Sequence, residues 1–212
     1  MSKSATQWLE DVDSTNERLA HEARLRLGGL GPADAWMAAQ LSVGVDVGDQ
    51  RRRFWSIIGL SALARSNALG PEARTVCWRL ISVASSDPDV GNRQAALTAL
   101  GRFPAHADVI VPAIVRVVRV AREAAVRVDG IRALCALGAA AAPAAGMLVS
   151  ALDDFDASVA RHASIALKFV TVAEPEHVRA IIAASLAHRD PDVRSQLQAA
   201  IRLQGYGASS AA

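Results

Sequence analysis

Small and apolar residues recur along the chain in one fixed pattern. They follow Arg127 at three, six and seven places, which puts them on one face of an α-helix. The same offsets recur after anchor positions spaced 36, 37, 34, 33 and 34 residues apart: Ala20, Ser56, Arg93, Arg127, Ala160 and Arg194. The match is weak only at Ala20, where Arg26 occupies the sixth place. A near-constant period of this size indicates tandem helical repeats.

Proline positions support the same period. Each interval between anchors contains a proline that opens another apolar segment: Pro32, Pro71, Pro104, Pro143 and Pro175. Proline suits the first turn of a helix because its missing N–H would have no partner there. The two signals together predict six pairs of helices, over residues 5–11 and 14–28, 33–43 and 49–66, 71–85 and 90–102, 105–121 and 123–138, 142–152 and 156–171, and 174–188 and 190–204.

Acidic residues lie a few places before the anchors: Asp13, Asp49, Asp87, Asp89, Asp154, Asp190 and Asp192. An aspartate in this position can cap the following helix and complement its dipole. We also expect ion pairs with the anchor arginine of the same repeat, from Asp190 to Arg194 and from Glu123 to Arg127. These acids and arginines are interpreted as structural rather than catalytic.

Two strings resemble the signature of HEAT repeats, especially the short bacterial HEAT-like repeats also found in phycobilin lyases. They are Asp-Pro-Asp-Val-Arg at 190–194 and Val-Arg-x-x-Gly-x-x-Ala-Leu at 126–134. The resemblance covers about residues 5–204 and is closer in the last four repeats, because Ala20 and Ser56 replace the arginine in the first two. It implies antiparallel helix pairs in a right-handed superhelix, with the second helix of each pair lining the concave face.

We therefore predict an all-α, right-handed α-solenoid of about six HEAT-like helix pairs. It forms a single domain over residues 1–204, followed by a flexible tail at 205–212. Composition agrees, because 51% of residues are hydrophobic and only 4% aromatic, which favours helices over a β-sandwich. The tryptophans all lie in the first half and are predicted to be core or N-terminal cap residues: Trp8, Trp36, Trp55 and Trp78.

Charge and cysteine usage narrow the classes of function. The net charge is only +2, so no strong overall field attracts nucleic acid or membrane. Cys77 and Cys135 are too few for a disulfide framework or a thiolate metal site, and both lie in apolar helical segments. No apolar signal segment or uninterrupted membrane span is evident, and the sequence predicts a soluble, cytoplasmic, bacterial protein. The three consecutive arginines at 51–53 are expected to be solvated.

The candidate binding surface follows from the repeat. Positions one, two, five, eight and nine after each anchor are expected to face the concave groove, where solenoids commonly bind partners. From 102 onward these positions are mostly basic. The candidate ridge consists of Arg102, Asp129, Arg132, Arg161, His162, Lys168 and Arg202. We expect it to contact an acidic protein segment or a phosphate-bearing ligand, the alternative being an ordinary solvated face.

Three classes of enzyme have folds of the kind that the resemblance implies. Deoxyhypusine hydroxylases hold two irons with several His-Glu pairs, and only His21-Glu22 matches here, which is too few ligands. HEAT-like alkylpurine DNA glycosylases use a concave aspartate beside aromatic and basic groups. Asp129, near Arg132 and Arg161, is the candidate, but the tryptophans lie two or more repeats away. Phycobilin lyases have similar repeats, without a pocket motif that can be carried over.

The sequence contains no conventional catalytic motif: it lacks a phosphate-binding loop, a Gly-x-Ser-x-Gly elbow and histidines at ligand spacing. We therefore predict no catalytic residues, no metal site and no cofactor. The favoured function is a non-enzymatic scaffold, expected as a monomer, that binds another protein in its concave groove and no membrane. The alternatives are nucleic-acid binding, with glycosylase activity as its enzymatic form, and a phycobilin-lyase-like function. The identity of the partner does not follow from the sequence.

Overall fold

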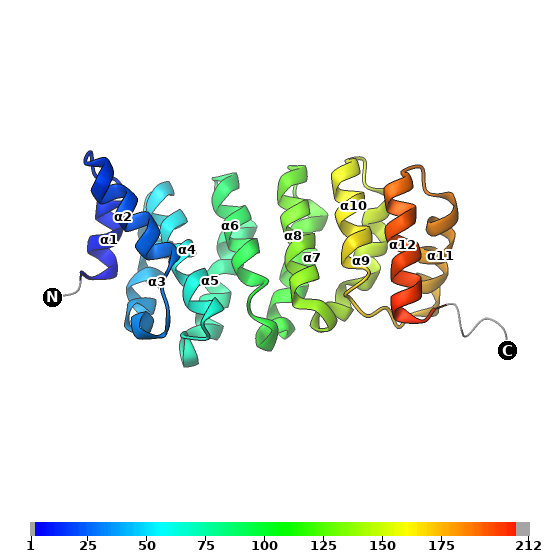
Figure 1. Cartoon of the computed structure of the whole chain (residues 1–212), viewed down its shortest axis with the longest axis horizontal. Helices are drawn as coiled ribbons and strands as arrows, with labels where there is room; N and C mark the ends of the chain where they lie inside the picture. Colours follow the sequence, from blue (N-terminus) through cyan, green and yellow to red (C-terminus); the bar gives the residue numbers. More distant parts are fainter. Residues whose placement is uncertain (1–2, 207–212) are drawn as a thin grey trace. The chain divides into compact units, whose positions relative to one another are not determined.

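The computed structural model describes residues 3–206, and all regular secondary structure within them is helical (Figure 1). The first helices of the pairs are α1 (Ala5–Asp11), α3 (Ala38–Val47), α5 (Ala73–Ser86), α7 (Ala107–Val120), α9 (Ala145–Ser150) and α11 (Pro175–Ala187). The second helices are α2 (Glu17–Gly28), α4 (Gln50–Arg65), α6 (Val90–Leu100), α8 (Ala124–Leu137), α10 (Ala157–Ala166) and α12 (Pro191–Gln204). The predicted all-α repeat fold is confirmed.

Most first helices begin in a short 3₁₀ turn that contains the periodic proline. These turns are η1 (Pro32–Met37), η2 (Gly70–Glu72), η3 (Pro104–His106) and η4 (Gly138–Ala144), while α11 begins directly at Pro175 and η5 (Ala151–Asp153) follows α9. The main difference from the predicted bounds is at α10, which ends at Ala166 instead of residue 171. The side-chain amide of Gln204 on α12 donates to the carbonyls of Leu167 and Val170 at 2.7 and 2.8 Å. These backbone acceptors after the end of α10 therefore have hydrogen-bond partners.

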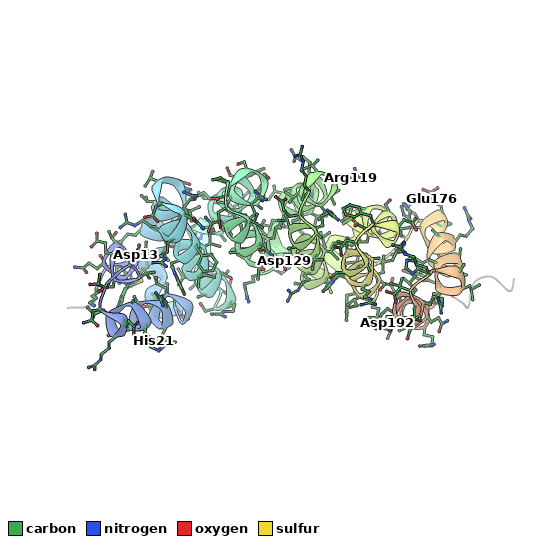
Figure 2. All side chains as sticks on the ribbon, turned by 90° about the horizontal axis from the view of Figure 1, so that it is seen from above. Asp13, His21, Arg119, Asp129, Glu176 and Asp192 are labelled. Atoms are coloured by element: carbon green, nitrogen blue, oxygen red, sulfur yellow. The ribbon has the colours of Figure 1, made fainter. Side chains whose placement is uncertain are left out.

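The chain forms two compact units, Met1–His106 and Ala107–Ala212. Within the first unit, α2, α4 and α6 stack in one layer and α1, α3 and α5 in the other. Within the second unit, α8, α10 and α12 form one layer. Figure 2 shows Asp129 of α8 and Asp192 of α12 on one side of this unit, opposite Arg119 of α7 and Glu176 of α11. We call the exposed side of the second helices in either unit the second-helix face.

The recurring small residues let the two helices of a pair approach closely. Gly59 and Gly130, each three places after an anchor, are buried on α4 and α8. A Cβ atom at Gly130 would lie 2.5 Å from Val118 of α7, and one at Gly59 would lie 2.9 Å from Leu41 of α3. The sequence period therefore reflects the contact between the helices of each pair.

The anchor arginines join the two helices of a pair at one end. Arg93, Arg127 and Arg194 each donate to the carbonyl oxygen six residues earlier, at 2.9, 3.1 and 2.5 Å. Each of these carbonyls belongs to the residue immediately after the first helix, where backbone acceptors lack helical partners and the helix dipole is negative. In the repeat whose anchor is Ser56, Arg53 does the same with the carbonyl of Gly48, at 2.7 Å.

The ion pairs of these arginines run to the following repeat. Arg53 binds both carboxylate oxygens of Asp87 at 2.7 and 3.2 Å, and Arg127 binds both of Asp154 at 2.9 and 2.8 Å. The pairing predicted within one repeat gives way to pairs between repeats, because Arg127 binds Asp154 and Asp190 binds Arg161. The acids near the anchors thus tie neighbouring repeats together.

The predicted capping role of the acids holds at the start of most second helices. Asp49, Asp89 and Asp190 are the N-caps of α4, α6 and α12, and each side chain accepts a backbone N–H of the first turn. The N-cap of α10 is Asp156 instead of the predicted Asp154. Asp13 is not a cap, since Asn16 caps α2.

Two predictions about individual side chains are wrong. The arginines at 51–53 are paired instead of merely solvated, because Arg51 lies 2.9 Å from Asp13 and Arg52 3.7 Å from Glu10, in addition to the pair made by Arg53. These acids offset the unfavourable position of arginines in the first turn of α4. Among the tryptophans, Trp8 is buried, but Trp36 and Trp78 are 49% and 54% exposed and are not core residues.

The chain remains ordered slightly beyond the predicted start of its tail. Gly205 ends α12 in the left-handed conformation at φ 71°. The hydroxyl of Tyr206 lies 3.1 Å from the amide nitrogen of Val172, which donates to it. Residues 207–212 of the predicted tail lie outside the described residues.

One helical stretch, Ala124–Asp153, is long and apolar enough to cross a membrane by composition, with a mean hydropathy of 1.7. Arg127, Asp129 and Arg132 interrupt it, so no continuous apolar run in the sequence predicts this stretch. It comprises α8, η4, α9 and η5, and its path turns at Gly138, where φ is 57°. Ile131 and Leu134 are fully buried in the second unit, so packing in the repeat core accounts for the apolar composition.

Candidate functional site

All of the predicted ridge residues are at least partly exposed. They are distributed over both units. Arg102 belongs to the first unit and the other six to the second. In the second unit, Arg132 is 3.3 Å from Asp129 of its own helix. Arg161 is 2.7 Å from Asp190 and 3.7 Å from Asp192, and this contact keeps the pKa of Asp190 below its ordinary value. These arginines therefore already have acidic partners.

Of the three remaining ridge residues in the second unit, two contact other residues of the protein and the third forms no ion pair among the described residues. Lys168 donates to Gln196 at 2.7 Å and lies 5.6 Å from the ring centre of Phe169. His162 contacts the carbonyl of Ser158 at 2.7 Å through Nδ1. Arg202 is exposed and forms no ion pair within residues 3–206. The structure thus leaves one ridge cation of this unit without an internal partner.

The first unit has an open cavity on its second-helix face, with a volume of about 510 Å³. It lies between α4 and α6, at the end of α2. The lining residues are Gly28, Phe54, Ile58, Ser61, Ala62, Arg65, Gly91, Gln94, Ala95, Thr98 and Arg102. Three of the predicted groove positions, Gln94, Thr98 and Arg102, therefore meet at one cavity.

Helical spacing explains why these residues share one groove. On α4, residues 54, 58, 62 and 65 follow at intervals of three or four, and Ser61 lies next to Ala62, so that they form a single stripe. On α6, residues 91, 94, 95 and 98 form the matching stripe. The facing side chains near the middle, Ala62 and Ala95, are small and leave the space open, while Phe54 and Ile58 provide apolar surface at one end.

Two arginines lie at the other end of the groove. Arg65 is the last residue of α4 and donates to the carbonyl of Gly28 at 2.6 Å, which holds its side chain in place. Arg102 follows the end of α6 and has an exposed side chain. Burial and, secondarily, the charge of Arg65 lower the pKa of Arg102. Among the described residues, neither guanidinium forms an ion pair with a carboxylate, and none of the residues lining the cavity is acidic.

A second cavity of about 400 Å³ shares Phe54 with the first. Its lining is more polar and consists of Arg24, Gln50, Arg51, Phe54, Trp55, Asp89 and Asn92. The rings of Phe54 and Trp55 meet edge to face at a centroid distance of 5.5 Å. Gln50 donates to Asp89 at 2.7 Å, so part of this lining is satisfied internally.

Sequence analysis missed Arg65 and the apolar wall of α4. The signal was present, because Arg65 follows Ser56 by nine places, as Arg102 follows Arg93. The serine at the anchor and the weak pattern of this repeat hid the correspondence.

The described residues give little support for catalysis. No group of three or more His, Cys, Asp or Glu side chains in this part of the chain could hold a metal ion. Asp129, the candidate glycosylase residue, is largely buried and lies beside Arg132 on α8, whereas all four tryptophans belong to the first unit. Burial raises the pKa of the Cys135 thiol, which disfavours the reactive thiolate.

Comparison with known proteins identifies the fold but no close relative. No family model matches the sequence, and no curated protein does either. An engineered protein of known structure superposes with a TM-score of 0.66 at 17% identity, covering 97% of this chain and 98% of that one. A designed armadillo repeat protein gives 0.62 at 14% identity, covering 95% of this chain and 100% of its own.

Two natural proteins show the same likeness. The karyopherin Kap121p bound to the SUMO protease Ulp1p gives a TM-score of 0.70 at 18% identity, and the match covers 95% of this chain but only 23% of the karyopherin. A chain of the CpcE–CpcF complex of phycocyanin lyase from Nostoc gives 0.56 at 18% identity, with 99% and 80% covered. At these identities the likeness shows the fold, and the chain accordingly has the helical-repeat fold of armadillo and HEAT-type solenoid proteins.

Proposed function

We propose that the protein is a non-enzymatic scaffold that binds another protein along its second-helix face. The observation that carries this proposal is the open cavity between α4 and α6 in the first unit. It combines apolar surface with two arginines that lack acidic partners among the described residues, and such surfaces are typical of protein recognition. The structural likeness to Kap121p in complex with Ulp1p adds support by analogy only.

Protein binding is favoured over nucleic-acid binding by the kind of surface that is available. Nucleic-acid binding derives most of its affinity from many cations that contact phosphates. Here three arginines of the second-helix face are engaged, Arg51 by Asp13, Arg132 by Asp129 and Arg161 by Asp190, and the net charge of the chain is only +2. The apolar residues in the groove wall, Phe54 and Ile58, would gain little from a phosphate backbone.

A matched pair of substitutions tests this function. Thr98→Arg places a long side chain in the groove from an exposed helix position, whereas Ser85→Arg adds the same side chain at an exposed position of α5, on the other layer. Proteins captured from the source cells, after nuclease treatment, should be retained by the wild type and by Ser85→Arg and lost with Thr98→Arg. Equal capture by both variants would show that the groove is not the binding site.

A salt titration on duplex DNA provides the complementary measurement. A protein-binding scaffold should show weak DNA affinity at physiological salt, because few phosphates could be neutralised at once. Tight DNA binding that falls steeply with salt would contradict the proposal.

A further inference from the structure

The groove between α4 and α6 has the features of a specific recognition site as well as of a general contact surface. Its length from Phe54 to Arg65 is about 16 Å at the helical rise per residue. An extended peptide of about five residues spans that distance. The cavity volume of about 510 Å³ is enough for a few side chains.

The chemistry differs between the two ends of the groove. Phe54 and Ile58 form an apolar end, and Ala62 and Ala95 continue the apolar floor toward the middle. The far end presents the two guanidinium groups of Arg65 and Arg102. An occupant that matches both ends needs an apolar group and an anionic group about 10 Å apart, which is the helical rise from Ile58 to Arg65.

The two arginines also constrain the kind of anion. Arg65 is positioned by its bond to the carbonyl of Gly28, and Arg102 lies close enough to Arg65 for the two like charges to interact. A carboxylate between them would accept charge-assisted hydrogen bonds and relieve the repulsion. With two cations on an otherwise uncharged lining, the site suits one carboxylate better than a polyanion.

We propose that this groove binds an extended peptide segment of a partner protein, seating an aspartate or glutamate between Arg65 and Arg102 and an aliphatic or aromatic side chain near Ile58. The inference rests on the proposed function and specifies the partner segment. Gln94 and Thr98 line the groove between the two ends and can contact the peptide backbone. The partner is therefore recognised by an apolar residue followed or preceded closely by an acid.

The test begins with a phage-displayed library of random heptapeptides selected on the full-length wild-type chain. Enriched peptides should carry an acidic residue within about three positions of a large apolar residue, the separation that the groove length allows. Affinities of the best peptide and of its Glu→Gln form are then measured by fluorescence anisotropy. The same measurements are made on Arg102→Gln, chosen because Arg102 forms no ion pair among the described residues whose loss would destabilise the fold.

A double-mutant cycle isolates the interaction. Replacing Arg102 or the peptide glutamate alone should weaken binding about tenfold, the usual cost of losing a charge-assisted hydrogen bond. Once Arg102 is replaced, changing the glutamate should cost much less. The control is Arg116→Gln, which removes an exposed arginine from α7, a first helix of the other unit, and should leave the affinity unchanged.

The outcomes separate this inference from the proposed function. The inference is overturned if the selected peptides lack an acid, or if Glu→Gln weakens binding equally to the wild type and to Arg102→Gln. If Thr98→Arg still abolishes binding of the selected peptides, the proposed function stands. If no selected peptide is sensitive to Thr98→Arg, both fail. Displacement of the peptide by duplex DNA at physiological salt also overturns the inference, because a nucleic acid would then be the better occupant of the groove.

Discussion

At the scale of single residues, the arginines in and next to the second helices divide into two kinds. Arg53 and Arg127 are largely buried, with side chains 20% and 6% exposed, and they hold helix ends and neighbouring repeats together. Arg65 and Arg102 lie on the second-helix face without carboxylate partners among the described residues. Spacing could not separate these kinds, because the partner of each buried arginine comes from the next repeat.

Asp87 allows a test of the buried kind. Its carboxylate is 4% exposed, and burial acts to raise its pKa, but hydrogen bonds from Arg53, the Asp89 amide and Asn92 outweigh burial and lower the pKa. The folded state therefore binds a proton less readily than the unfolded chain. The resulting stability is complete above the unfolded pKa of about 3.9 and is lost as pH falls through the lower, folded-state pKa.

We expect Asp87→Asn to lower the free energy of unfolding by about 2–3 kcal/mol at pH 7, because it leaves Arg53 without its charge partner. The difference from wild type should shrink as pH falls below 4. Urea unfolding followed by circular dichroism between pH 3 and 7 measures it, with the exposed Asp153→Asn as control. A constant difference across this range would show that the charge of Asp87 does not stabilise the fold.

At the scale of helices, the sequence predicted most of the structure because each pair repeats the same local requirements. A proline opens the first helix, an aspartate caps the second, and a small residue follows the anchor by three places. What it could not predict was which arginine faces which acid, the exposure of Trp36 and Trp78, and the cavity. Those features depend on how successive pairs stack, and side chains from two repeats decide them.

Gly130 tests the close approach of α7 and α8. Alanine favours helix more than glycine by about 1 kcal/mol, yet a Cβ there would lie 2.5 Å from Val118. We expect Gly130→Ala to lower stability by about 1–3 kcal/mol in spite of its helix propensity, because the helices must move apart.

A second substitution makes this prediction specific. Val118→Ala removes the methyl group that the new Cβ would meet, so the double variant should be more stable than the sum of the two single effects implies. Thermal unfolding of all four proteins gives this coupling. Simple additivity would mean that the contact does not limit the approach of the helices.

At the scale of the whole molecule, the chain consists of two compact units, each with its own two helix layers. In repeat proteins stability arises from each repeat and from its contacts with adjacent repeats, so a local change spreads only a short way. The bidentate pair of Arg127 with Asp154 is one such contact between adjacent repeats.

We expect Arg127→Ala to accelerate amide hydrogen exchange mainly in α7, α8, α9 and α10, since it removes both the pair with Asp154 and the bond to the carbonyl of Ala121. Exchange in α1–α4 should stay as in the wild type. Hydrogen exchange followed by mass spectrometry checks this by peptide, and uniform acceleration along the chain would indicate a single cooperative unit instead.

The arginine–aspartate ion pairs between successive helix pairs also determine where a segment of the chain can be duplicated or exchanged. Each bidentate arginine needs an aspartate from the next helix pair, which lies 34 residues after Arg53 and 27 residues after Arg127. A duplicated or exchanged segment that begins and ends at equivalent loop positions brings its own acid to the preceding arginine. Segments chosen in this way should join without loss of the arginine–aspartate pairs. Proteins with more or fewer helix pairs can therefore be assembled while the groove between α4 and α6 stays intact.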